Sequence, residues 1–210
     1  MSAQMAVPPI LESGDHLTRA EFHRRYCARP EIKRAELVEG VVYVGSPVRA
    51  DLHAEPHARV VAWLGAYWAS HPYLRLSDNG TVILDSDNEV QPDACLWQEE
   101  AGGTHVTEDH YIQGAPQLVV EVAASSASYD LHEKLRAYRR NGVREYIVWR
   151  VLDGAIGWLR LRDGEYVPAE PDARGVIESE AFPGLRLTVV KMLAGDLAGV
   201  LAELEPPTRQ

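Results

Sequence analysis

Residues 117–150, QLVVEVAASSASYDLHEKLRAYRRNGVREYIVWR, decide the fold of this chain. An apolar run ends at Glu121-Val122 and is followed by small and polar residues. We predict a helix over 129–140, which Gly142 ends in the left-handed conformation that glycine adopts freely, and then a strand over 144–150. Strand, helix and strand at this spacing predict a βαβ unit, in which a right-handed crossover joins two parallel strands.

Two charged residues stand inside these apolar elements. Glu121 lies near the end of the first strand. Lys134 shares one stripe of the predicted helix with Leu131, Leu135 and Tyr138, so it is aimed at the sheet. Burying a charge costs on the order of several kcal/mol unless the charge is paired or bound to a metal. We therefore expect both residues to have partners in the folded chain.

A third buried charge is expected at Asp93, in the triplet Gln91-Pro92-Asp93. Residues 81–84 and 89–97 are predicted to be two strands, joined by a polar turn over 85–88. In the second strand Asp93 shares one face with Gln91, Cys95 and Trp97, and Val90, Pro92, Ala94 and Leu96 share the other. Asp93 therefore has apolar neighbours on both sides.

The remaining segments are predicted to complete a single mixed α/β domain over 17–203, with a loose lead-in over 1–16 and a frayed tail over 204–210. Thr18 and Glu21 have the spacing of a capping box at the start of a helix. The other expected elements are a helix over 18–28, a hairpin of strands 35–39 and 41–45 that turns at Glu39-Gly40, a buried helix from Pro56 to Ala69, a loop or short helix within 98–116, strands over 155–162, 165–168, 176–180 and 185–189, and a short terminal helix.

Composition excludes several classes of protein. The net charge of −10 argues against a protein that coats nucleic acid or an anionic membrane non-specifically, because such binding needs clustered Lys and Arg. Cys27 and Cys95 stand far apart with no CxxC pair, which favours small buried hydrophobes over a disulfide scaffold or a structural zinc site. No signal peptide and no apolar run long enough to cross a bilayer is found, so we expect a soluble cytoplasmic protein.

One histidine pair superficially resembles a zinc-hydrolase helix. His53 and His57 stand four residues apart with Glu55 between them. Pro56 would have to lie inside the helix that presents both imidazoles, and no third ligand follows at a suitable spacing. A helix-entry loop with a histidine that faces the site or the surface is the better interpretation.

Asp93, Glu121 and Lys134 can converge, because open α/β sheets place their sites at the carboxyl ends of strands. Two carboxylates suit Mg²⁺ or Mn²⁺, and such an ion can activate a water and offset the charge that grows during phosphodiester cleavage. The alternative is a purely structural role, in which Lys134 and Glu121 form a buried ion pair that completes the core.

An ordered set of motifs from about residue 18 to 195 resembles the Uma-two family of predicted endonucleases, within the PD-(D/E)XK superfamily of restriction-endonuclease-like proteins. The motifs are Glu36-Leu37-Val38-Glu39-Gly40, His57, Gln91-Pro92-Asp93, Gly114-Ala115-Pro116-Gln117 with the following run to Val122, Tyr129-Asp130-Leu131-His132-Glu133-Lys134-Leu135, Gly142-Val143-Arg144-Glu145-Tyr146-Ile147-Val148 and Phe182-Pro183-Gly184-Leu185. The resemblance implies a restriction-endonuclease-like fold, in which a mixed central sheet with a βαβ crossover is flanked by helices.

The resemblance also implies Asp93 and Glu121 as ligands of Mg²⁺ (or Mn²⁺), with Glu36 or Glu39 as an outer carboxylate and His57 lining the site. The basic pattern of the superfamily has a lysine two residues after the second acid, where this chain has Ala123. In the family the lysine is thought to come from the following helix, which corresponds to Lys134. A second departure is Ala124-Ser125, where Ser-Pro is common.

The distribution of charge bears on the substrate. Residues 85–109 carry eight acids and no Lys or Arg, whereas residues 129–150 carry six bases and three acids. DNA is therefore expected to approach over the second stretch, with the basic first helix as a further surface, and with binding that weakens steeply as salt rises. The sequence favours a Mg²⁺-dependent endonuclease acting on DNA, with a homodimer plausible because paired cuts need paired sites. The alternative is a catalytically inactive nuclease-fold protein that binds nucleic acid or a protein partner.

Overall fold

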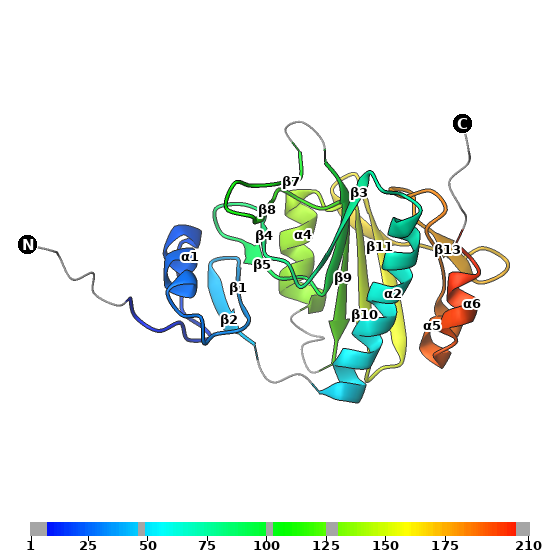
Figure 1. Cartoon of the computed structure of the whole chain (residues 1–210), viewed down its shortest axis with the longest axis horizontal. Helices are drawn as coiled ribbons and strands as arrows, with labels where there is room; N and C mark the ends of the chain where they lie inside the picture. Colours follow the sequence, from blue (N-terminus) through cyan, green and yellow to red (C-terminus); the bar gives the residue numbers. More distant parts are fainter. Residues whose placement is uncertain (1–7, 46–48, 100–102, 125–129, 205–210) are drawn as a thin grey trace, which may run out of the picture.

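The computed structural model describes residues 8–45, 49–99, 103–124 and 130–204. These residues form two six-stranded sheets and a two-stranded hairpin, with helices on both faces of the larger sheet (Figure 1). The mixed α/β class predicted from the sequence is confirmed, but the single central sheet is not. The second sheet consists of strands of two to four residues, and such short strands leave little periodicity in a sequence.

The larger sheet contains the predicted βαβ unit. Its strands stand in the order β12-β11-β10-β9-β6-β3, and only β9 and β10 are parallel among the described strands of this sheet. The helical turn η2 and helix α4 lie between these two strands in the chain and end at Gly142, whose φ of 83° is left-handed. The bounds are β3 (Leu74–Asp78), β6 (Ala94–Gln98), β9 (Leu118–Ala123), η2 (Asp130–Lys134), α4 (Leu135–Asn141), β10 (Glu145–Arg150), β11 (Ala155–Arg162) and β12 (Glu165–Pro168).

The two faces of this sheet carry separate apolar cores. Helix α2 (Glu55–Ala69) covers one face, where Trp63 and Leu64 pack among Leu96, Val120 and Ile147. Helix α4 covers the opposite face, where it packs on alternate residues of the same strands, Cys95, Val119, Ala123, Tyr146 and Val148. In Figure 1 the two helices lie on either side of β9 and β10. Strands covered on both faces are apolar almost throughout, and β9 is buried at every position.

The smaller sheet holds the predicted hairpin. Its order is β2-β1-β5-β4-β8-β7, and Glu39 and Gly40 both have positive φ at the turn between β1 and β2. The described part of the lead-in contacts this hairpin: Leu11 is buried, and the N–H of Gly14 donates to the carbonyl of Val42 at 2.8 Å. The bounds are β1 (Ala35–Val38), β2 (Val41–Val44), β4 (Val82–Ile83), β5 (Glu89–Val90), β7 (His105–Val106) and β8 (Ile112–Gln113).

The strand predicted over 89–97 is wrong as a continuous element. It is divided into β5 of the smaller sheet and β6 of the larger one, and residues 91–93 form the break. Pro92 has no N–H to donate to a strand partner, so the ladder cannot run through it. The connection over 98–116 is also not a loop or helix throughout, because it contains β7 and β8.

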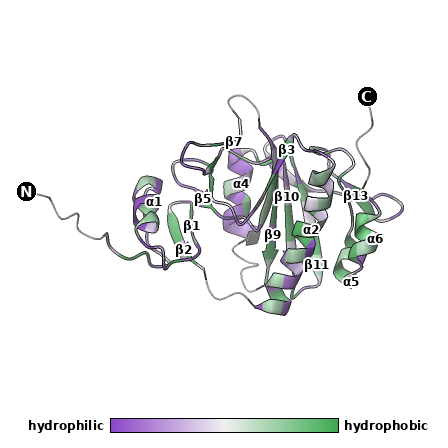
Figure 2. Ribbon diagram, viewed as in Figure 1, coloured by the Kyte–Doolittle hydropathy of each residue, from purple (hydrophilic) through white to green (hydrophobic). Residues whose placement is uncertain are grey.

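The remaining elements flank these sheets. Helix α1 begins after Thr18, whose hydroxyl accepts a hydrogen bond from the N–H of Glu21 as the capping-box spacing predicts. Figure 2 shows β9 and β10 as hydrophobic and α4 as largely hydrophilic, as expected for covered strands and a surface helix. Among the described residues, no helix is long and apolar enough to cross a membrane. The bounds are α1 (Arg19–Cys27), η1 (Ala50–Ala54), β13 (Val176–Glu178), β14 (Arg186–Thr188), α5 (Val189–Ala194) and α6 (Leu197–Leu201).

Candidate functional site

The break between β5 and β6 sets the position of Asp93. Strands β6 and β9 are antiparallel with Ala94 opposite Val120, so continuing this register by one residue places Asp93 opposite Glu121. The Asp93 carboxylate takes over as a ladder acceptor there, since its Oδ2 accepts the N–H of Val122 at 2.7 Å. Side chains directly opposite each other in such a pair lie on the same face and within reach of one another.

Helix α4 and the turn before it bring a lysine and a tyrosine to Glu121. Lys134 Nζ donates to Glu121 Oε1 at 2.9 Å, and the hydroxyl of Tyr138 donates to the same oxygen at 2.8 Å. The two donors stand one helical turn apart and all three side chains are buried. Ala123 lies on the same face of β9 as Glu121 and is buried there.

Strand β1 contributes a third carboxylate from the smaller sheet. Glu36 Oε1 lies 2.9 Å from Lys134 Nζ and accepts the N–H of Gln91 at 2.7 Å. Lys134 is thus held between Glu36 and Glu121, one from each sheet. The site therefore lies where the two sheets meet, and four segments distant in sequence build it.

Arg34 is a site residue that the sequence argument missed. Its Nη1 donates to Asp93 Oδ1 at 2.9 Å, and its Nη2 lies 4.0 Å from Glu121 Oε2. Nη2 also donates to the carbonyl of Gln91 at 2.7 Å. One signal was present: Arg34 stands two residues before Glu36, and the period of two in a strand puts both side chains on one face.

The charges around the site shift three pKa values. Burial alone would raise the pKa of the Asp93 carboxyl, but the hydrogen bond to His53 and the charge of Arg34 outweigh burial and hold that pKa well below its usual range. Burial opposes the charged form of Arg34, yet Glu36, Asp93 and Glu121 together raise its pKa. Burial and the neighbouring Glu121 raise the pKa of Tyr138 well above its ordinary value. Asp93 and Arg34 are therefore charged, and Tyr138 is a neutral donor.

The structure separates the secondary candidates. Glu39 lies at the β1–β2 turn, where its carboxylate contacts Asn88 and Arg140. It is therefore not grouped with the carboxylates of Asp93, Glu121 and Glu36. His57 Nε2 lies 2.9 Å from the backbone carbonyl of Asp93, so it lines the site without touching the carboxylate. His53 is closer to the chemistry, with Nε2 3.3 Å from Asp93 Oδ1. Its contact arises because η1 continues into α2 at Glu55 and places both imidazoles on the Asp93 side.

The carboxylates of the site are donors of the kind that a divalent ion binds. Within the described ranges, no three His, Cys, Asp or Glu side chains are grouped so that they could hold a metal by themselves. Asp93 and Glu121 nevertheless offer two hard carboxylates, and both lie beside one guanidinium, which shows that a cation is accommodated at this place. Mg²⁺ commonly takes one or two protein carboxylates and keeps several waters. The pair fits such an ion, provided that Arg34 yields its contacts.

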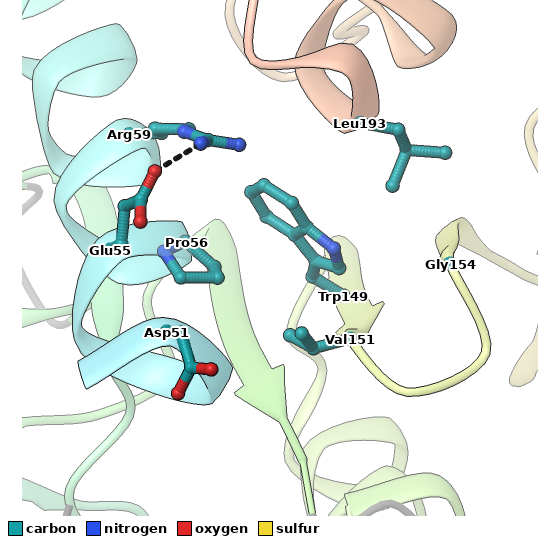
Figure 3. Close-up of a pocket in the computed structure, with 8 residues that line it drawn as sticks. All are labelled: Asp51, Glu55, Pro56, Arg59, Trp149, Val151, Gly154 and Leu193. Carbon is teal, nitrogen blue, oxygen red and sulfur yellow. Dashed lines mark hydrogen bonds and ion pairs between the residues drawn. The ribbon is translucent and has the colours of Figure 1, made fainter. Parts of the chain in front are cut away.

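A separate cavity of about 190 Å³ lies between helix α2 and the end of β10. Figure 3 shows Trp149 and Val151 on one wall and Glu55, Pro56 and Arg59 on the other. An ion pair joins Arg59 to Glu55 there. The described residues that line the cavity do not include Asp93, Glu121 or Lys134, so the cavity is not the carboxylate site.

Comparison with known proteins agrees with this architecture. No curated protein matches the chain. A solved structure that resembles it is the crystal structure of a "putative nuclease belonging to DUF820" from Anabaena variabilis ATCC 29413, with a TM-score of 0.58 and 15% sequence identity over 76% of this chain and 89% of that one. At this identity the likeness concerns the fold alone. Residues 19–190 match the Uma2 family, described as "Putative restriction endonuclease", and the chain therefore belongs to the Uma2 family.

Proposed function

We propose that this chain is a Mg²⁺-dependent endonuclease that hydrolyses DNA phosphodiester bonds, on a fold of the restriction-endonuclease type. One observation carries the proposal: Asp93, Glu121 and Lys134, which are far apart in the sequence, meet at one buried place with Glu36. Three buried acids and a buried lysine cost more to maintain than an apolar core of the same volume. Family membership supports the same reaction class.

Asp93 and Glu121 are the residues that would hold the ion. A bound Mg²⁺ would act as a Lewis acid that activates a water as the nucleophile and offsets negative charge on the phosphate. The N–H of Val122 fixes the Asp93 carboxylate, and Lys134 and Tyr138 fix that of Glu121. Their oxygens are therefore held in place before any ligand arrives, which lowers the cost of reorganisation.

Lys134 supplies positive charge from the chain itself. Its ammonium lies 2.9 Å from both Glu36 and Glu121, so two carboxylates hold it in place at the buried edge of the site. A charged donor in this position would stabilise charge that develops on a phosphate oxygen or orient an attacking water by hydrogen bonding. Glu36 acts through Lys134 as a positioning residue.

A second candidate is a catalytically inactive nuclease-fold protein that binds nucleic acid or a protein partner. Ion pairs favour this second candidate, because most of the arginines of α4, where DNA is expected to approach, already have acidic neighbours. Arg136 pairs with Glu133, Arg139 with Glu165, and Arg140 with Glu39 and Asp85. Such pairs reduce the positive potential that would attract a phosphate backbone.

Cleavage of supercoiled plasmid DNA with Mg²⁺ or Mn²⁺ tests the first candidate. We expect Asp93→Asn and Lys134→Ala to reduce the rate by at least about a hundredfold, since each removes a group that would contact the metal or the reacting atoms. Glu145→Gln is the matched control, because Glu145 is a buried carboxylate of β10 whose contacts are Ser179, Glu180 and Arg160. Equal cleavage by all four proteins would rule out this site.

A further inference from the structure

We propose that Arg34 is the internal counter-cation of the Asp93–Glu121 pair, and that a divalent ion binds by displacing its guanidinium from these carboxylates. The inference rests on the proposed function, because it takes the same two acids as metal ligands. It assigns to a residue outside the predicted trio a role in setting the affinity for metal.

The contacts of Arg34 define the position. Its Nη1 donates to Asp93 Oδ1 at 2.9 Å, and its Nη2, which donates to the carbonyl of Gln91 at 2.7 Å, lies 4.0 Å from Glu121 Oε2. A guanidinium that is bonded to Asp93 and lies beside Glu121 occupies space that an ion shared by the two carboxylates would need. Arg34 and the metal are therefore competitors for the same oxygens.

The charges around Asp93 explain why Arg34 competes with a metal ion. Lys134 contacts Glu36 and Glu121, and its described partners do not include Asp93. Arg34 supplies the permanent positive charge beside Asp93, and His53 contributes only when it is protonated. Without Arg34, three buried acids would face one lysine, and the excess negative charge would attract a divalent cation.

The side chain of Arg34 is more exposed than the two carboxylates, which allows a metal ion to replace its guanidinium. The side chain of Arg34 is 27% exposed, whereas those of Asp93 and Glu121 are each 2% exposed. Arg34 directly precedes β1, and its side chain is only partly covered by its neighbours. The guanidinium can therefore turn toward solvent while both carboxylates stay in place. The apparent affinity for metal is then the intrinsic affinity multiplied by the fraction of molecules in which Arg34 has moved out.

Titration with Mn²⁺ alone, followed by electron paramagnetic resonance of the free ion, tests the competition. We expect Arg34→Met to lower the Kd for Mn²⁺ by about tenfold or more. Arg160→Met is the matched control: Arg160 is partly buried beside the buried Glu145, so the variant makes the same change in net charge away from the site. Its Kd should stay within about twofold of the wild-type value.

Two more variants keep the test decisive. Arg34→Lys retains a positive charge but not the planar fork that reaches both acids, so its Kd should fall between those of wild type and Arg34→Met. Should Arg34→Met fail to fold, a wild-type Kd in Arg34→Lys would overturn the proposal. Adding Asp93→Asn to Arg34→Met should abolish the gain in affinity, and a persisting gain would also overturn it.

The two proposals fail differently. If Mn²⁺ binds wild type and Arg34→Met with the same Kd, and Asp93→Asn abolishes that binding, the Arg34 proposal is wrong and the metal site stands. If no variant and no wild-type protein binds Mn²⁺ at millimolar concentration, the metal site is wrong and the Arg34 proposal falls with it.

Discussion

Lys134 joins two carboxylates of the site, one from each sheet. It is buried, and its ammonium contacts Glu36 and Glu121 at 2.9 Å each. Breaking a buried ion pair by removing one partner is costly because the other charge stays uncompensated, whereas replacing both partners is far cheaper. The same contacts therefore contribute to the folded state whether or not the site is catalytic.

Lys134→Met should lower the free energy of unfolding by about 3–5 kcal/mol, because two carboxylates lose their buried partner. Combining it with Glu121→Gln should recover part of the loss, so the two single effects will not add. Urea unfolding of wild type, both single variants and the double variant measures the coupling. Strict additivity would show that the pair at 2.9 Å makes no net contribution.

The hydroxyl of Tyr138 gives a second prediction. It donates to the charged Glu121, and Tyr138→Phe removes only that oxygen from a buried ring. We expect a loss of about 1.5–3 kcal/mol, typical of a hydrogen bond to a charged group. Tyr166→Phe is the control, because its hydroxyl donates to the neutral carbonyl of Val143 and should cost about 1 kcal/mol. Urea unfolding that ranked them in reverse would contradict a charged Glu121.

At the scale of elements, Asp85 joins helix α4 to the turn before β5. Its carboxylate accepts hydrogen bonds from Asn141, Arg140 and Asn88, and from the backbone N–H of Asp87. Burial by itself would raise the pKa of Asp85, but these hydrogen bonds outweigh it and lower the pKa to about 2. The C-terminal end of α4 is thereby tied to the β4–β5 turn of the smaller sheet.

Stability should therefore depend on Asp85 in acid. Because its folded pKa is lowered from 3.8 to about 2, its contribution is complete above pH 4 and is lost as the pH falls toward 2. Asp85→Asn should lower stability by about 1–2 kcal/mol near neutral pH, and the difference from wild type should shrink below pH 4. Urea midpoints from pH 7 to pH 2 measure it, and a difference that is constant with pH would contradict the assignment.

At the scale of the whole molecule, net charge and ion pairing oppose binding to DNA. The chain carries a net charge of −10, and the arginines of α4 lie beside acids such as Glu133 and Glu165. The phosphate backbone of DNA can therefore bind only where arginines give up their ion pairs with acids of the same chain. Each arginine that gains a phosphate contact should steepen the dependence on salt.

Glu165→Gln should tighten binding of duplex DNA, because it frees Arg139 for a phosphate. Measured by fluorescence anisotropy in an Asp93→Asn background, the slope of log K against log salt should grow by about one. Glu203→Gln makes the same change in net charge near α6, where its partners are Lys191 and Arg174, and serves as the control. An equal effect of both variants would show that only net charge matters.

The sequence by itself determined the local elements and named the chemical groups. Alternating and helical periodicity predicted the βαβ unit, the β1–β2 hairpin and helices α1 and α2, because these patterns arise within short windows. Out-of-place charges identified Asp93, Glu121 and Lys134, and the structure brings them together, although their catalytic roles stay predictions. Glu36 and Glu39 could not be told apart in this way, since the strand predicted over 35–39 contains both.

Only the tertiary structure decided how the elements are joined and what the charges contact. The division of residues 89–97 between two sheets depends on partners elsewhere in the chain, which no local window contains. Arg34 lies 59 residues from Asp93 in the sequence, so their contact has no local signature. His53 likewise reaches the carboxylate only because η1 runs into α2. Burial and pairing are properties of the folded chain. They bring Asp93, Glu121 and Lys134 into one site, and Arg34 adds a second positive charge to it.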